Sequence, residues 1–285
     1  MNHILKAGLD FIIYSSLLIS TAAAVLTLEI FYTSGIPINW PYIAFVFSST
    51  FLIYALHRVI GITRIHTVNI EGRFETILKY RHHLKIYALL SSVVCVYIFL
   101  KYFEYTDIIY FLPAGMIALP YVLPVFGNSR LRDFHFIKIF LIALTWAYVC
   151  VGLPQMLNDT KFGDLNWIAF FEKALFIFAI TIPFDIRDAK IDRIENVKTI
   201  AGTLGPKKAY LISYSTCMIA IILLFCTLQS SSQAFFHHIL ICLVVYIPVL
   251  GLIRLSDKKS SDYYYSGLLD ASILIRSGLL LIFLQ

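Results

Sequence analysis

Residues 167–193 read WIAFFEKALFIFAITIPFDIRDAKIDR. Up to Pro183 this stretch is an apolar run with only two charges, close in length to the roughly 20 residues that a helix needs to cross a membrane. Three aspartates follow the run directly. This order predicts a membrane-spanning helix that ends in carboxylates at a boundary between lipid and water.

The rest of the chain repeats the apolar pattern. Its 285 residues are 59% hydrophobic and 14% charged, whereas globular domains are about 45–50% apolar and about 25% charged. So little polar surface excludes a water-soluble fold of this size. We expect an all-α protein: a polytopic membrane bundle of about nine transmembrane helices around a central cavity, forming one domain over residues 1–285. The predicted spans are residues 9–32, 40–60, 84–103, 108–126, 136–156, 167–183, 209–228, 235–253 and 267–284.

Lys and Arg are concentrated in the loops after the second, fourth, sixth and eighth predicted spans. Because such residues collect on the cytoplasmic side of a membrane, this pattern predicts a cell-membrane protein with its N-terminus in the cytoplasm and its C-terminus on the opposite side. The net charge of +6 then describes one membrane face. Its expected partners are the lipid bilayer and an anionic head group, and no nucleic acid is expected.

The aspartates Asp185, Asp188 and Asp192 are spaced i, i+3 and i+7, which places them on one face of a helix. Three carboxylates this close repel one another unless a cation lies between them. Mg²⁺ accepts carboxylate oxygens while it shares substrate phosphates, so we predict these residues as Mg²⁺ ligands and as catalytic residues. Spacing alone also allows a solvated loop of mixed charge. The basic residues around them, which suit a phosphate ligand, are Arg187, Lys190, Arg193 and Lys198.

The longer string from Asp185 to Gly205, DIRDAKIDRIENVKTIAGTLG, resembles the second aspartate-rich motif of the UbiA superfamily of intramembrane prenyltransferases. Thr199, Gly202 and Gly205 match the tail of that motif. The resemblance implies about nine helices, an N-terminus inside, and two aspartate-rich loops that hold a Mg²⁺-bound prenyl diphosphate. It also implies that a lipophilic acceptor, often an aromatic ring, attacks the allylic carbon after the diphosphate leaves.

The sequence departs from the family pattern in two places. The first aspartate-rich motif should end the second span, but residues 53–61, IYALHRVIG, contain no carboxylate. His57 and Arg58 stand there instead. Two interpretations stay open: they bind diphosphate oxygens directly, or they cap a helix C-terminus. Tyr121 matches the first residue of a family Tyr-x-x-x-Lys pattern, but Val125 replaces the lysine. The predicted diphosphate-binding residues are His57, Arg58, Tyr121, Arg187, Arg193 and Lys198.

The missing first motif leaves other functions open. The leading expectation is a prenyltransferase that acts on a prenyl diphosphate and an aromatic or other lipophilic acceptor. One alternative is a catalytically inactive relative that binds an isoprenoid or a partner protein. Another is a small-solute transporter that uses Asp270 and Arg276, although these residues fit a buried polar tie between helices at least as well. We expect Glu29 and Lys173 to extend toward the membrane surface, and residues 263–265, three tyrosines, to form an interfacial belt.

Overall fold

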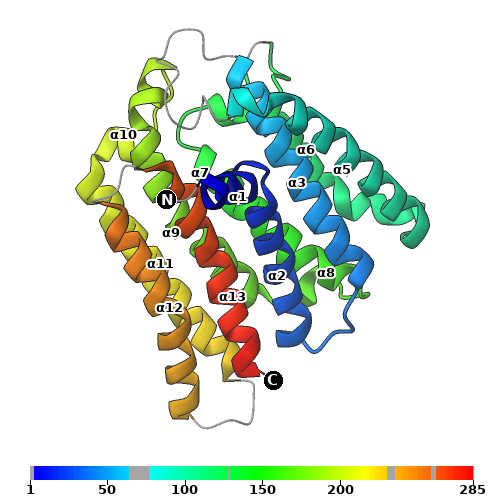
Figure 1. Cartoon of the computed structure of the whole chain (residues 1–285). Helices are drawn as coiled ribbons and strands as arrows, with labels where there is room; N and C mark the ends of the chain where they lie inside the picture. Colours follow the sequence, from blue (N-terminus) through cyan, green and yellow to red (C-terminus); the bar gives the residue numbers. More distant parts are fainter. Residues whose placement is uncertain (1–2, 64–76, 128, 230–234, 258–260, 285) are drawn as a thin grey trace.

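The computed structural model describes residues 3–63, 77–127, 129–229, 235–257 and 261–284. The long helices run side by side along one direction (Figure 1). The α-helices are α1 (His3–Tyr14), α2 (Leu17–Thr33), α3 (Trp40–Thr63), α5 (Arg81–Tyr102), α6 (Ile108–Val122), α7 (Lys138–Ala147), α8 (Leu153–Met156), α9 (Trp167–Ile194), α10 (Ile200–Leu204), α11 (Pro206–Leu228), α12 (Phe235–Ser256) and α13 (Asp270–Leu284). The shorter 3-10 and π-helices are η1 (Tyr105–Asp107), η2 (Leu131–Asp133), η3 (Tyr148–Gly152), η4 (Phe162–Asp164) and η5 (Tyr263–Leu269).

Eight helices in the described part of the chain are long and apolar enough to cross a membrane, and the bent pair of α1 and α2 makes a ninth span if it is counted as one. The π-helix η3 joins α7 and α8 into one span, and η5 continues into α13 in the same way. The predicted all-α bundle is therefore confirmed, and the chain is a multi-pass membrane protein. Most of the basic loop expected after the second span, residues 64–76, lies outside the described residues.

The first span was predicted as one continuous helix, which is wrong. The chain bends by 57° between α1 and α2. Ser16 adopts a left-handed conformation with φ 78°, which a continuous α-helix does not allow. The Ser15 hydroxyl accepts a hydrogen bond from the Leu17 amide, 3.3 Å away, at the start of α2. The break turns α1 across the bundle, so that its last residue, Tyr14, lines the cavity described below.

Pro183 was predicted to close the sixth span, but α9 runs through it to Ile194. A proline inside a helix leaves the carbonyl four residues earlier without its amide donor. That carbonyl belongs to Ala179, and the Ser213 hydroxyl from α11 donates to it at 2.7 Å. The neighbouring helix thus supplies the missing donor, and the aspartate motif is helical as the spacing predicted.

Helix α6 ends at Val122, four residues before the predicted end of the fourth span. Leu123 has an extended backbone with ψ 143°, the conformation that a following proline, here Pro124, favours. Pro113 and Pro120 lie inside α6 without ending it. The early end places Tyr121 in the last turn of α6, at the cavity.

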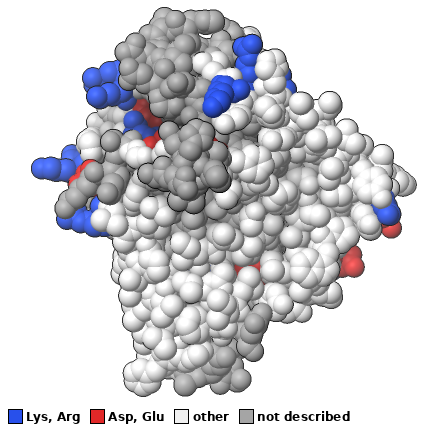
Figure 2. Space-filling view, in the orientation of Figure 1, with Lys and Arg blue, Asp and Glu red and all other residues white. Residues whose placement is uncertain are grey.

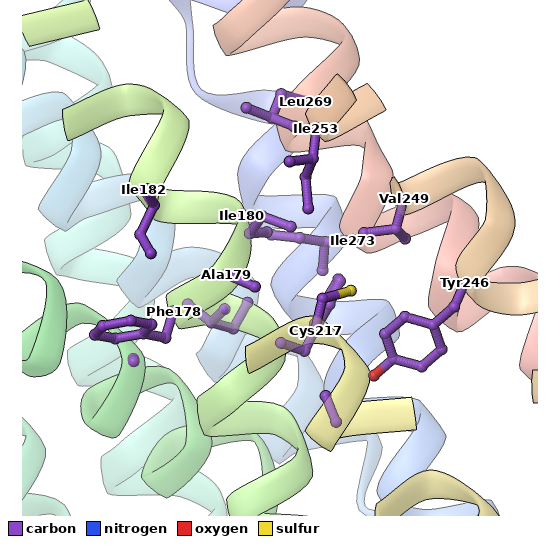
Figure 3. Close-up of a cluster of buried hydrophobic side chains, with 14 of the residues drawn as sticks. Phe178, Ala179, Ile180, Ile182, Cys217, Tyr246, Val249, Ile253, Leu269 and Ile273 are labelled. Atoms are coloured by element: carbon purple, nitrogen blue, oxygen red, sulfur yellow. The ribbon is translucent and has the colours of Figure 1, made fainter. Parts of the chain in front are cut away.

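The core lies between α9, α11, α12 and α13. Buried side chains of these helices, including Ile180, Cys217, Val249, Ile253 and Ile273, pack against one another (Figure 3). A second cluster joins α2, α3 and η3. Within a membrane such helices are held by close packing and by buried hydrogen bonds rather than by exclusion from water.

A buried ionic cluster crosses this core. Lys173 Nζ lies 2.6 Å from a carboxylate oxygen of both Glu29 and Glu172. Arg276 pairs with Glu29 and, at 2.6 Å, with Glu172, which also accepts a hydrogen bond from Tyr246. None of these side chains is more than 2% exposed. The prediction that Glu29 and Lys173 extend to the membrane surface is therefore wrong, whereas the interpretation of Arg276 as a buried tie is confirmed.

The predicted tyrosine belt is wrong for two of its three members. Tyr264 and Tyr265 are buried, at 6% and 4% exposure. The Tyr264 hydroxyl donates to the Leu252 carbonyl, and the Tyr265 hydroxyl donates to the Ser256 carbonyl at 3.1 Å. These bonds fasten η5 to α12 instead of anchoring it at the surface.

On the face shown in Figure 2, Lys and Arg side chains gather toward one end of the bundle, and the long flank is nearly free of charge. We call this end, which holds the last turn of α3 and the first turn of α5, the basic end. Helix α13 runs away from it, and the chain finishes at the opposite end (Figure 1).

Candidate functional site: a cavity at the basic end

A cavity of about 350 Å³ opens among α3, α6, α7, α9 and η5. Its walls differ in character from one region to another. The basic residues of the lining are Arg58, Arg130, Arg132, Lys138 and Arg187. The apolar residues include Ile53, Ile117, Ala118, Leu141, Ile142 and Trp146. Most of these apolar residues lie one or two helical turns away from the basic ones, toward the middle of the bundle, so the cavity has a charged end and an apolar end.

Lys138, in the first turn of α7, lies between two of the predicted aspartates. Its Nζ is 3.0 Å from Asp185 Oδ1 and 3.0 Å from Asp192 Oδ2. Asp185 is fully buried, and its Oδ2 accepts a hydrogen bond from the Ala201 amide at 3.2 Å. That amide belongs to the first turn of α10, where Thr199 caps the helix by accepting from the Gly202 amide. Asp185 therefore connects α9 to both α7 and α10.

Asp188 has a different partner. Arg187 Nε and Nη2 donate to its two carboxylate oxygens at 2.8 and 3.0 Å. Arg187 Nη1 donates to Asp262 at 2.9 Å. The guanidinium also lies 5.1 Å from the ring centre of Phe184 and 5.0 Å from that of Tyr265. Arg187 is thereby fixed at the cavity wall by two carboxylates and two aromatic rings.

The three predicted aspartates lie on one face of α9, but they do not all contact the same cation. Asp185 and Asp192 face the ammonium of Lys138, and Asp188 faces Arg187. In the described part of the chain, no three His, Cys, Asp or Glu side chains converge closely enough to hold a metal ion. In this arrangement the residues do not fit a Mg²⁺ site, because protein cations already take up the carboxylate oxygens that the ion would need.

His57 and Tyr121, both predicted to bind diphosphate, meet at the cavity together with Arg132. Arg132 Nη1 is 2.5 Å from His57 Nε2, so this ring nitrogen carries a lone pair that accepts the guanidinium hydrogen. The Arg132 guanidinium also lies 5.5 Å from the centre of the Tyr121 ring. The two predicted residues thus hold an arginine that the family pattern did not assign.

Arg58 also lines the cavity. Its Nη2 donates to the Ile13 carbonyl at 2.9 Å, and its guanidinium lies 5.8 Å from the Tyr14 ring centre. Its Nη1 is buried and finds no hydrogen-bond partner among the described residues. This geometry favours the diphosphate-binding interpretation over a helix cap, because the side chain lines the cavity and its Nη2 donates to α1 rather than to the last carbonyls of α3.

Two other predicted phosphate partners lie elsewhere. The side chains of Arg193 and Lys198 are exposed and are not part of the cavity lining. The Lys198 backbone instead holds the loop before α7, since its amide donates to His135 Nδ1 and its carbonyl accepts from the Phe136 amide. In the same region, the backbone carbonyl of Asp192 accepts a hydrogen bond from the Val197 amide.

Three basic residues of the cavity, Arg130, Arg132 and Lys138, were not among the residues predicted from the sequence. Arg130 donates to Asp133 from Nε and, at 2.8 Å, from Nη2. Burial disfavours the charged form of Asp133 and by itself would raise its pKa. The hydrogen bonds from Arg130 outweigh this effect and hold the pKa of Asp133 below its usual value. In the sequence all three residues appear only as positive charge in a loop, and nothing there shows which of them turn inward.

These features define a multi-pass helical membrane protein with a cavity that is charged at one end and apolar at the other. Its fold is similar to that of solved UbiA homologs. The apo structure of a UbiA homolog from Aeropyrum pernix K1 matches with a TM-score of 0.65 at 12% identity, over 95% of this chain and 97% of that one. A UbiA homolog from Archaeoglobus fulgidus bound to DMAPP and Mg²⁺ matches with a TM-score of 0.60 at 12% identity, over 94% and 99%.

A third solved structure, described for digeranylgeranylglyceryl phosphate synthase in membranes, matches with a TM-score of 0.54 at 16% identity, over 96% of this chain and 97% of that one. No protein-family model matches the sequence, and no curated protein matches it. The likeness therefore lies in the fold, and the site has to be interpreted from its own residues.

Proposed function

We propose that this protein is a membrane prenyltransferase-like protein that transfers an isoprenyl group from a prenyl diphosphate to an aromatic or other lipophilic acceptor. One observation carries the proposal: a single cavity joins a cluster of arginine and lysine side chains to an apolar wall inside the bundle. An amphiphile with an anionic head and a hydrocarbon tail has the same division of charge. The fold shared with a relative solved with bound DMAPP supports this ligand class.

In this proposal the diphosphate lies at the charged end of the cavity. Arg58 supplies the unpartnered Nη1 donor, and Arg132 supplies a guanidinium held by His57 and Tyr121. The prenyl chain lies against the apolar residues that line the deeper part, such as Leu141 and Trp146. The aspartates act indirectly, because they hold Lys138 and Arg187 at the cavity wall.

The transfer breaks the bond between the allylic carbon and the diphosphate oxygen, and the electron pair leaves with the diphosphate. A nucleophilic atom of the acceptor forms the new bond to that carbon, and the acceptor then loses a proton. Cations fixed beside the departing diphosphate stabilise the charge that develops on it. The apolar wall keeps the prenyl chain in a position to react.

Binding is tested first, by thermal stability of the detergent-purified protein with geranyl diphosphate, because a ligand of the folded state raises the unfolding temperature. We expect a concentration-dependent rise in the wild type that weakens at least about tenfold in apparent affinity in Arg58→Gln, the loss of one charged hydrogen bond. Arg193→Gln, the same substitution at an exposed residue outside the cavity, should keep the wild-type response. Equal responses of the two variants would contradict a head-group site at Arg58.

A non-catalytic binder is the second candidate, favoured by the absence of a carboxylate from residues 53–61 at the end of α3. Release of diphosphate with a set of phenolic and glycerol-phosphate acceptors separates the two candidates, because a binder gives the thermal response without any release. The transporter alternative named Asp270 and Arg276, and the structure separates them. Asp270 lines the cavity, whereas Arg276 belongs to the buried ionic cluster and does not, so the two residues do not form one site.

A further inference from the structure

We propose that the ammonium group of Lys138 occupies the place of a divalent cation in this site, so that the protein binds its anionic ligand without Mg²⁺. The ligand part of this inference rests on the proposed function, whereas the statement about the ion does not. The carboxylates of Asp185 and Asp192 lie on the same face of α9, two turns apart, and a single positive group 3.0 Å from each lies between them. This is the arrangement in which a metal ion would otherwise bridge them.

In this arrangement of side chains, the space between Asp185 and Asp192 has no room for a cation besides the Lys138 ammonium. Lys138 is 7% exposed, Asp192 is 4% exposed and Asp185 is fully buried. An ion that entered would have to displace the ammonium or lie beside it in a region of low dielectric, where like charges repel strongly. The second Asp185 oxygen is also engaged, by the Ala201 amide.

Three other carboxylates that line the cavity, those of Asp188, Asp262 and Glu195, have cationic partners as well, whereas a fourth, Asp270, has no cation within 4 Å among the described residues. Both oxygens of Asp188 accept from Arg187, which also binds Asp262. Glu195 lies 3.8 Å from Arg130. At the end of α3, where the family pattern places further aspartates, the chain carries His57 and Arg58. Protein cations thus replace metal-bridged contacts on both sides of the cavity.

The ion is tested without any substrate, by Mn²⁺ electron paramagnetic resonance on the purified full-length protein. We expect the wild type to leave added Mn²⁺ free at millimolar concentration. Lys138→Ala removes the ammonium and leaves two neighbouring carboxylates, so this variant should bind about one Mn²⁺. The double variant Lys138→Ala/Asp192→Asn should lose that ion again, and Lys138→Arg, which keeps the charge, should bind none.

Two outcomes would overturn the inference about the ion. Stoichiometric Mn²⁺ binding by the wild type would show that Lys138 does not exclude a metal, and this measurement needs no variant to fold. A folded Lys138→Ala protein that leaves Mn²⁺ free would show that the two carboxylates are not a cation site that the lysine fills.

The ligand part is tested with the thermal response to geranyl diphosphate in EDTA and in Mg²⁺. We expect binding in EDTA to be at least as tight as in Mg²⁺. A response that needs Mg²⁺, or that strengthens tenfold with it, would overturn the inference while the proposed function stands. No response in either solution would instead overturn the proposed function, and the Mn²⁺ result would still decide whether Lys138 holds the place of the ion.

Discussion

At the scale of single residues, Ser213 explains how Pro183 is tolerated in the middle of α9. The proline leaves the Ala179 carbonyl without an amide donor, and the Ser213 hydroxyl supplies one from α11 at 2.7 Å. Ser213 has no exposed surface, and a bare carbonyl in this interior would lose several kcal/mol of solvation without a partner. The serine therefore permits the helix to carry the aspartates beyond the proline to the cavity.

Ser213→Ala should destabilise the protein by about 1–3 kcal/mol, the usual cost of leaving a buried acceptor unsatisfied. Thermal unfolding in detergent measures the change. Ser20→Ala is the matched control, because Ser20 is equally buried and its hydroxyl also donates to a carbonyl, that of Ser16. The Ser16 carbonyl keeps the amide of residue 20 as a donor, so this control should change stability much less. Similar losses in both variants would show that the hydroxyl does not serve the proline.

At the scale of helices, the buried ionic cluster joins four elements at one depth of the bundle. Glu29 comes from α2, Glu172 and Lys173 from α9, and Arg276 from α13, while Tyr246 of α12 donates to Glu172. The cluster contains two acids and two bases, so its formal charge is zero. Charges buried in a membrane bundle are stable only when they compensate one another. The cluster therefore fixes the depth at which these helices pack.

Arg276→Met should destabilise the protein by about 3–5 kcal/mol, because it leaves one carboxylate charge uncompensated in the interior. The double variant Glu29→Gln/Arg276→Met retains only the close pair of Glu172 and Lys173. It should therefore unfold at a higher temperature than the single variant, although it has lost more contacts. A double variant less stable than Arg276→Met would indicate that the cluster acts through packing and not through charge balance.

At the scale of the whole molecule, the sequence was sufficient for the bundle and for the helical aspartate motif. Both depend on local features: runs of apolar residues of membrane length, and the i, i+3 and i+7 spacing of Asp185, Asp188 and Asp192. The resemblance of residues 185–205 to the UbiA motif indicated the fold, and the solved relatives confirm it. Tyr121 and His57, which the sequence analysis selected from the family pattern, lie beside each other at the cavity, and their role in binding stays a prediction.

The partners of the charged residues could not be predicted, because they come from helices far apart in the chain. Lys138 lies 54 positions before Asp192, and Arg276 lies 247 positions after Glu29. A sequence shows that these residues are charged but not which carboxylate each one meets. The same limit explains why Pro183 was interpreted as a helix end, since Ser213 approaches from another helix.

The membrane orientation is the last property that the whole chain should reveal. The basic end carries the loops rich in Lys and Arg, which predicts that it faces the cytoplasm. Cysteine substitutions at the exposed residues Lys207 and Lys161, on opposite ends of the bundle, in a Cys226→Ser background test this with a membrane-impermeant maleimide on intact cells. We expect labelling at position 161 and none at position 207 until the cells are opened. The four remaining native cysteines are buried and should add little background labelling. Labelling of position 207 on intact cells would reverse the orientation and place the cavity on the outer side.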